Sequence, residues 1–189
     1  MISFALEGGV DPVVGWSQRI FLAAVFARAA YGKLRAPRAF AEAIRGYAVL
    51  PDSTAIAGSA AFGLLTLEAV VVVGLLSSDW ASAASLVAAG LLLIYSAAIG
   101  LNLARGRRDI DCGCAGAGGR TALHEWLLAR NGLYVAMAAC AALPLAARNL
   151  LWLDAITIGL AVLSLGTLAV AFDGLAALAT GLRRGEVRR

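Results

Sequence analysis

The sequence predicts an all-α integral membrane protein, built as a four-helix antiparallel bundle with a fifth transmembrane helix beside it. Hydrophobic residues make up 61% of the 189 residues and the mean hydropathy is +0.82. Soluble domains rarely exceed about half apolar residues. Several apolar runs are also longer than about 18 residues, the length that a membrane-spanning helix requires. We therefore expect a single membrane domain over residues 1–189.

Five apolar runs are long enough to span a bilayer, and polar links or breaks separate them. These expected spans lie at about residues 13–31, 55–76, 80–104, 124–147 and 151–172, and the last would reach residue 178 if it is tilted. Because their connections are short to moderate, the first four should pack as antiparallel neighbours, with the fifth on the outside. Residues 1–12 carry no Lys or Arg before the first run, so a cleaved signal peptide is not expected.

Charged residues inside the first two spans should face the interior of the bundle, because they are costly in lipid. The first span carries Arg19 and Arg28, and the second carries Glu68. At a rise of about 1.5 Å per residue, Arg19 and Glu68 lie at similar depths below the outer ends of their spans. The sequence therefore predicts an ion pair between Arg19 and Glu68, whereas Arg28 lies deeper and matches Glu68 less well.

Residues 33–52 form a basic link between the first two spans. After Pro37, apolar residues alternate with charged residues at helical spacing, and Pro51 ends the pattern. We expect an interfacial amphipathic helix at about residues 37–48, with a solvated loop as the alternative.

The basic residues also predict how the chain is oriented. Twelve of the 16 Lys and Arg residues lie in the 33–52 link, the 105–123 loop and the C-terminal tail, which share one side if there are five spans. By the positive-inside rule this side is cytoplasmic and the N-terminus lies outside. The net charge of +4 does not predict nucleic-acid binding, because the basic residues sit at membrane edges.

The 105–123 loop holds two of the three cysteines, in the sequence Asp111-Cys112-Gly113-Cys114. Gly113 removes the steric cost of a bend that would bring the two sulfurs together. A disulfide across so short a loop would be strained, and strained disulfides are the labile, catalytic kind. The pair favours thiol–disulfide redox chemistry, with Cys114 as the preferred thiolate because it is nearer to the start of the fourth helix.

Two other uses of the cysteine pair stay open, namely soft ligands for a metal and an inert structural role. The chain has one His and two Met, which counts against a soft-metal binder, so no metal site is predicted. His124, at the start of the fourth span, could carry a proton to a leaving thiolate, and the alternative, slightly favoured, is an interfacial polar residue without a chemical role. Cys140, deeper in the same span, should be a packed small residue.

Four further polar residues gather near the inner ends of their spans: Arg28, Asn102, Arg130 and Asn131. This set could position a quinone head group, a thiolate or simply the helices. A quinone is the one cofactor that the sequence suggests.

The order of these features resembles the MauE branch of the MauE/DoxX family of redox-associated membrane proteins. The features that carry the resemblance are an arginine-containing first helix, Lys33-Leu34, Pro51, Glu68, Asp111-Cys-Gly-Cys and Arg130-Asn131. They extend over roughly residues 16–147, so the fifth span lies outside the resemblance.

The resemblance implies a helical bundle of the bacterial cytoplasmic membrane that exchanges electrons with a thioredoxin-like partner. It also implies a part in maturing the disulfide-rich methylamine dehydrogenase, an exported protein. The charge pattern instead puts the cysteine loop on the cytoplasmic side; a relay of electrons across the membrane, or a loop tucked into the bundle, would reconcile the two. A subunit that assists assembly without chemistry is the remaining alternative.

Overall fold

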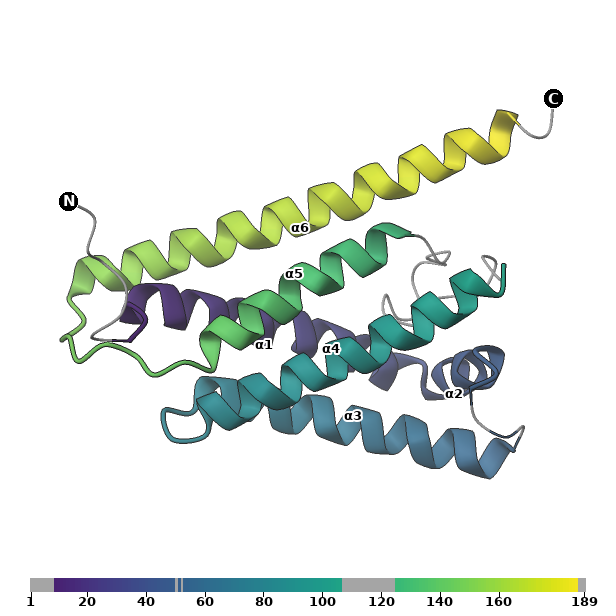
Figure 1. Cartoon of the computed structure of the whole chain (residues 1–189), viewed down its shortest axis with the longest axis horizontal. Helices are drawn as coiled ribbons and strands as arrows, with labels where there is room; N and C mark the ends of the chain where they lie inside the picture. Colours follow the sequence, from purple (N-terminus) through teal and green to yellow (C-terminus); the bar gives the residue numbers. More distant parts are fainter. Residues whose placement is uncertain (1–8, 50, 52, 107–124, 187–189) are drawn as a thin grey trace.

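The computed structural model describes residues 9–49, 51, 53–106 and 125–186, without the side chains of residues 176, 177 and 179–186. Within these ranges the chain is helical, and its other regular feature is an isolated bridge between Val10 and Leu145. The helices are α1 (Pro12–Arg35), α2 (Pro37–Gly46), α3 (Thr54–Leu76), α4 (Ala81–Ala104), α5 (Glu125–Ala141) and α6 (Trp152–Glu186) (Figure 1). The predicted all-α class is confirmed for the described residues.

Within the described residues, α3, α4 and α6 are long and apolar enough to cross a membrane. Their outer surfaces carry large exposed apolar side chains such as Val73, Leu93 and Leu163, which are 70%, 56% and 66% exposed. An apolar surface of this extent is unfavourable in water but is well solvated by the acyl chains of lipids. The protein is therefore a helical membrane protein.

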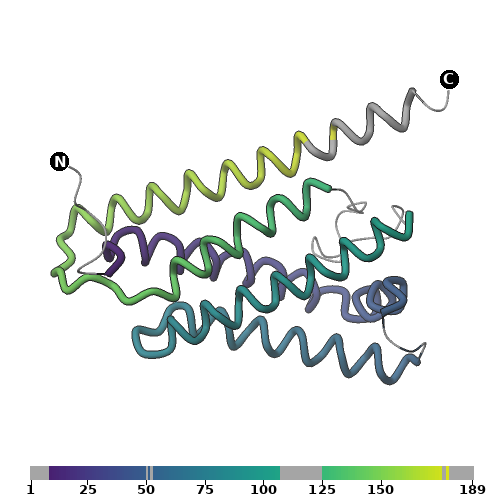
Figure 2. Tube along the Cα trace, viewed as in Figure 1, coloured from purple at the N-terminus to yellow at the C-terminus, as the bar shows by residue number. Residues whose placement is uncertain are grey.

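Four helices enclose a common interior, and we call α1, α3, α4 and α5 the helical core. α1 packs against α3 and α5, and α4 packs against the same two helices. α2 lies on α3, and α6 lies along α1 (Figures 1 and 2). The C-terminal ends of α1 and α4 meet the starts of α3 and α5 at one end, which we call the α2 end; the other is the far end.

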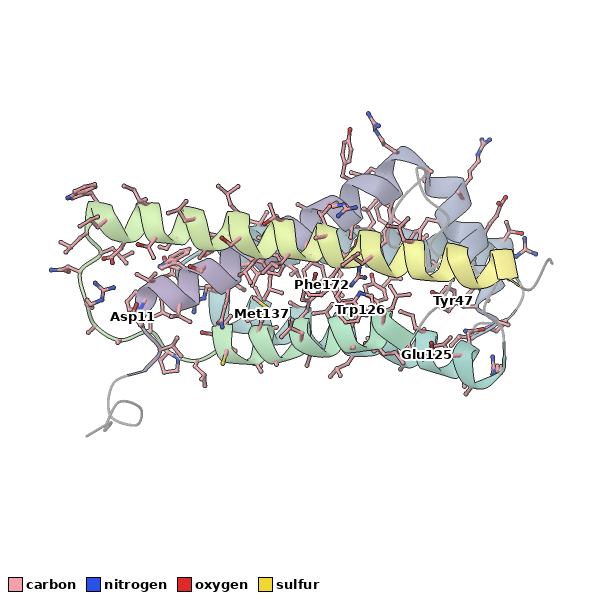
Figure 3. All side chains as sticks on the ribbon, turned by 90° about the horizontal axis from the view of Figure 1, so that it is seen from above. Asp11, Tyr47, Glu125, Trp126, Met137 and Phe172 are labelled. Carbon is pink, nitrogen blue, oxygen red and sulfur yellow. The ribbon has the colours of Figure 1, made fainter. Side chains whose placement is uncertain are left out.

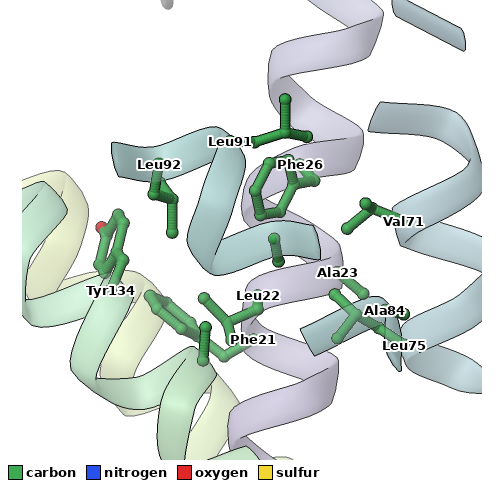
Figure 4. Close-up of a cluster of buried hydrophobic side chains, with 12 residues drawn as sticks. Phe21, Leu22, Ala23, Phe26, Val71, Leu75, Ala84, Leu91, Leu92 and Tyr134 are labelled. Carbon is green, nitrogen blue, oxygen red and sulfur yellow. The ribbon is translucent and has the colours of Figure 1, made fainter. Parts of the chain in front are cut away.

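Apolar side chains from all four core helices meet in the middle of this interior. The contributors include Phe21 and Leu22 of α1, Leu75 of α3 and Leu91 of α4 (Figure 4). The ring of Phe21 packs edge to face on that of Tyr134 of α5, with 5.5 Å between ring centroids. This cluster sets the spacing of the helices that carry the polar side chains described below.

Two of the helices begin at residues whose side chains cap the free backbone N–H groups. Asp11 precedes α1, which starts with Pro12, and its carboxylate accepts a hydrogen bond of 2.8 Å from the backbone N–H of Val13. Ser53 caps α3 in the same way. A side-chain acceptor at this position and a proline in the first turn both favour helix initiation.

Three helix ends differ from the expected spans. α1 continues past residue 31 to Arg35, so Lys33 lies within the helix and not in the link. α5 ends at Ala141, short of the expected 147, because Pro144 has no N–H to continue a helix. α6 runs beyond residue 172 to Glu186.

The connection after α5 folds back on the start of the chain at the far end. The Val10 N–H donates to the Pro144 carbonyl at 2.9 Å, and the Ala146 N–H donates to the Val10 carbonyl at 2.8 Å. Gly9 beside them has a φ of +82°, and a Cβ there would lie 2.5 Å from the Pro144 oxygen. Only glycine fits this approach without a backbone shift.

Candidate functional site

Three polar side chains from three different helices meet inside the helical core. Lys33 of α1 forms an ion pair with Glu68 of α3, and the two are 4% and 0% exposed. The Tyr95 hydroxyl of α4 donates to Glu68 Oε1 at 2.6 Å and accepts from Lys33 Nζ at 3.2 Å. We call this group the Lys33–Glu68–Tyr95 triad. It carries no net charge, as a group buried at membrane depth should.

Two aromatic rings complete the surroundings of the Lys33 ammonium. Lys33 Nζ lies 4.8 Å from the ring centroid of Phe40 and 4.9 Å from that of Tyr95. Phe40 belongs to α2, so this helix closes the site from the α2 end. Such rings stabilise a desolvated cation. Among the described residues no donor reaches Glu68 Oε2, which is buried.

The predicted ion pair between Arg19 and Glu68 is wrong. Glu68 pairs with Lys33 instead, while Arg19 Nε and Nη2 donate to the carbonyl of Ala141 at 3.2 and 3.0 Å. Ala141 is the last residue of α5, so Arg19 supplies donors to a helix end that lacks them. Its guanidinium also lies 5.7 Å from the ring centroid of Trp16.

The depth comparison failed because it left Lys33 out of the first span. Side chains on a helix point toward its N-terminus, so Lys33 reaches back from the last turn of α1 into the core. Its long apolar stem lets the ammonium reach a carboxylate that lies deeper than its own backbone. Arg19 instead donates hydrogen bonds to a backbone carbonyl of α5.

The four residues expected to gather near the inner ends of the spans contact different neighbours. Asn102 is fully buried in α4, and its Nδ2 donates to the Tyr47 carbonyl at 3.2 Å and to the Ala98 carbonyl at 3.0 Å. Asn131 is 4% exposed, and Leu127, one turn before it on α5, packs on Ile99 of α4. Asn131 therefore lies on the side of α5 that faces α4, the helix that carries Asn102.

Arg130, next to Asn131, is turned toward α6. Its Nη1 donates to both carboxylate oxygens of Asp173, at 2.8 and 2.9 Å. One turn earlier on α5, Trp126 packs on Phe172, with ring centroids 5.5 Å apart (Figure 3). These contacts fasten α6 to α5. The expected span ended at residue 172, and an acidic residue directly after it was the signal that could have identified Asp173.

Arg28 lies on the exposed side of α1, contrary to the expectation that it faces the interior. Arg130 instead joins α5 to α6 through its ion pair with Asp173. These contacts favour two separate polar groups over a single quinone site formed by Arg28, Asn102, Arg130 and Asn131.

A second set of charges lies at the far end, around the starts of α1 and α6. Arg148 forms ion pairs with Asp11 at 3.2 Å and with Asp154 at 3.0 Å. The pKa of Asp11 is lowered, first by the hydrogen bond from the Val13 N–H and then by Arg148. The Asp154 carboxylate in turn raises the pKa of Arg148. The side chains of Arg148 and Asp11 are 39% and 49% exposed and that of Asp154 is 16% exposed, so much of their attraction is screened by water.

The predicted reactive residues Cys112, Cys114 and His124 lie outside the described residues. α4 ends at Ala104 and α5 begins at Glu125, both at the α2 end (Figure 1). Cys140 of α5 is exposed, not packed as expected, because its side of the helix faces away from the core. The described residues contain no group of three or more His, Cys, Asp or Glu side chains that could hold a metal ion.

Comparison with known proteins gives a consistent result. The family model described as methylamine utilisation protein MauE matches residues 11–144. A "Methylamine utilization protein MauE" of Paracoccus denitrificans is 40% identical over 129 residues, which cover 68% of each chain. Those of Paracoccus versutus and Methylorubrum extorquens are 40% and 35% identical, over 72% and 76% of this chain and 73% and 71% of theirs. No solved structure matches.

Proposed function

Because the chain belongs to the MauE family, we propose that it acts in methylamine utilisation, as a membrane protein that exchanges electrons through Cys112 and Cys114. The observation that carries the proposal is Asp111-Cys112-Gly113-Cys114 in a family member whose relatives bear that name. Helices α4 and α5 support it, since α4 ends and α5 begins at the α2 end of the helical core, on either side of the cysteine pair in the sequence.

The proposed reaction is a thiol–disulfide exchange with a thioredoxin-like partner. The Cys114 thiolate attacks one sulfur of the partner's disulfide, so a mixed disulfide forms and the partner's other thiolate leaves. Cys112 then attacks Cys114, which closes the Cys112–Cys114 disulfide and releases the partner as a dithiol. His124 gives a proton to the leaving thiolate. Reversing these steps moves the electrons toward this chain.

We further propose that the helical core is an antiparallel four-helix membrane bundle with α6 as a fifth span. α5 has 17 residues, which is near the lower limit of a membrane helix. α1 is less hydrophobic than α3, α4 and α6 because it contains Arg19, Arg28 and Lys33. The side chains of Arg19 and Lys33 are buried in the protein and do not face lipid. The charge distribution then puts the N-terminus outside and the α2 end in the cytoplasm of a bacterial inner membrane.

Trapping of the mixed disulfide tests the proposed reaction. In a Cys140→Ser background, single variants that keep only Cys112 or only Cys114 should capture a protein of the thioredoxin type through a reducible bond. The variant that lacks both cysteines is the matched control and should capture nothing. If neither single-cysteine variant forms such an adduct, while a purified sample retains a soft metal, the metal-binding use of the pair replaces this proposal.

Labelling from either side of the membrane tests the proposed topology. A membrane-impermeant maleimide applied outside should leave Cys112 and Cys114 unmodified and should modify Asn149→Cys, an exposed position of the far-end connection. Labelling of Cys112 or Cys114 from outside would reverse the proposed orientation and would place the exchange on the side of exported proteins.

A further inference from the structure

Lys33 is the only lysine among the 16 Lys and Arg residues of the chain. Its side chain is 3% exposed and forms the ion pair with Glu68 inside the helical core. Arginine is the usual residue in a buried ion pair, and its guanidinium does not give up a proton in proteins. A buried lysine can be deprotonated, so Lys33 permits a proton transfer that an arginine at the same position would prevent.

The partners of Lys33 can also carry a proton. The Tyr95 hydroxyl accepts a hydrogen bond from Lys33 Nζ at 3.2 Å and donates one to Glu68 Oε1 at 2.6 Å. These bonds connect an amine, a phenol and a carboxylate from three helices. The second carboxylate oxygen, Glu68 Oε2, is buried, and no donor among the described residues reaches it. A buried acceptor without a donor is uncommon, and a water molecule that enters the site would supply one.

Helix α2 covers this group at the α2 end. The triad belongs to the core helices, whereas the Phe40 ring, whose centroid lies 4.8 Å from Lys33 Nζ, belongs to α2. None of the ten residues of α2, all of which the structure describes, is buried, and the helix packs on α3 from outside the core. Movement of α2 would therefore uncover Lys33 without breaking its bonds to Glu68 and Tyr95.

The chain leaves the helical conformation at both ends of α2. Ala36 precedes Pro37, and its φ of −140° and ψ of 62° separate α1 from α2. After α2, Ala48 has a φ of +49° and is the one residue other than glycine with a positive φ in the part of the chain that the structure describes. A residue with a Cβ rarely adopts this conformation. Positions of this kind at the ends of a short helix are suited to a hinge.

We propose that α2 is a hinged cover of the Lys33–Glu68–Tyr95 triad and that, when it opens, the triad exchanges a proton with water from the α2 end. An entering water donates a hydrogen bond to Glu68 Oε2. One N–H bond of the Lys33 ammonium breaks as its proton passes to water, and the neutral amine then takes a proton from water, so the triad returns to its original charge. The inference does not use the cysteine pair and stands apart from the proposed thiol–disulfide exchange.

Acylation of Lys33 by a water-soluble N-hydroxysuccinimide ester, applied to the full-length protein in mixed micelles, tests the cover. The reagent must pass α2 and reacts only with the neutral amine, so the rate depends on both opening and loss of a proton. Because Lys33 is the single lysine, mass spectrometry of its peptide measures the rate, and the N-terminal amine is counted separately. Wild-type Lys33 should react slowly, and Phe40→Ala should speed the reaction by about tenfold.

Two further variants sharpen the result. Phe62→Ala is the matched control, because it makes the same change on α3 at a side chain that is 71% exposed, and it should leave the rate unchanged. Ala48→Gly should slow the reaction, because glycine relieves the backbone strain of the closed position. Equal rates in the wild type, Phe40→Ala and Phe62→Ala would overturn the cover, as would a wild-type rate equal to that of a lysine in an unstructured peptide. A faster reaction in Ala48→Gly would overturn the hinge.

A thiol probe separates the opening of α2 from a general loosening of the core. Ser85 of α4 is fully buried, so Ser85→Cys in a protein without the three native cysteines should stay unreactive toward a maleimide, with or without Phe40→Ala. If Phe40→Ala speeds labelling equally at both positions, loosening of the core replaces the hinged cover. If Phe40→Ala does not fold, Phe40→Leu, which keeps an apolar side chain but removes the ring, should still speed the acylation of Lys33.

Discussion

The buried Lys33–Glu68–Tyr95 triad and the exposed Asp11–Arg148–Asp154 network use the same interaction at the two ends of the molecule. The triad lies where neither water nor salt reaches, and its members come from α1, α3 and α4. The far-end network is open to water and joins the start of α1 to the start of α6. Removing one member of the triad should therefore lower the free energy of unfolding strongly. Removing one member of the far-end network should lower it only slightly, because water can solvate the partner that remains there.

The largest effect is expected from Glu68→Ala. This change leaves the Lys33 ammonium buried without an anion, at a cost of about 3–5 kcal/mol in the free energy of unfolding. Glu68→Gln keeps an acceptor oxygen for Lys33 and Tyr95 and should cost clearly less. Unfolding in mixed micelles, followed by tryptophan fluorescence, measures both. Equal stabilities of the two variants would show that the triad does not depend on the charge of Glu68.

Tyr95→Phe tests the third member of the triad. The change removes the hydroxyl that donates to Glu68 Oε1 but keeps the ring beside Lys33. We expect a loss of about 1.5–3 kcal/mol, the usual range for a hydrogen bond to a charged group. A control is Tyr31→Phe on the exposed side of α1, which should leave the unfolding midpoint unchanged. A neutral Tyr95→Phe would mean that Lys33 alone satisfies Glu68.

Asp173→Asn probes an intermediate case. The Arg130 and Asp173 side chains are 18% and 35% exposed, so the pair is neither fully screened nor fully buried. We expect a loss of about 1 kcal/mol, with α6 separating from α5 more readily than the core unfolds. Limited proteolysis in the 142–151 connection should detect this separation. Cleavage at the wild-type rate would place the attachment of α6 in its apolar contacts with α1.

The smallest effect is expected at the far end, where it should depend on pH. The pKa of Asp11 is lower in the folded protein than in the unfolded chain, so its contribution is present above the unfolded value of about 3.9 and is lost as the pH falls through the folded value. Asp11→Asn keeps a helix cap but removes the charge. The variant should therefore lose less thermal stability than the wild type between pH 6 and pH 3. High salt should reduce this difference between the two proteins, because it screens the attraction that the wild type has and the variant lacks.

The helices could be predicted from the sequence because apolar runs and their caps are local signals. The apolar runs expected at about residues 13–31 and 55–76 lie within α1 and α3. The partners of the charged residues could not be predicted, because pairing depends on how far one helix slides along another. Lys33 was read as part of a link, although the stagger of α1 against α3 brings it to Glu68. Asp173 was missed because it follows the last apolar run that was counted.

The central claim is that Cys112 and Cys114 cycle together between a dithiol and a disulfide. The direct measurement is a redox titration of the Cys140→Ser protein in glutathione buffers, with the free thiols counted by mass-tagged alkylation. We expect both thiols to disappear together in one two-electron transition that is reversible, and Cys112→Ser or Cys114→Ser to abolish it. Two thiols that stay alkylatable across the whole range of potentials would contradict the claim.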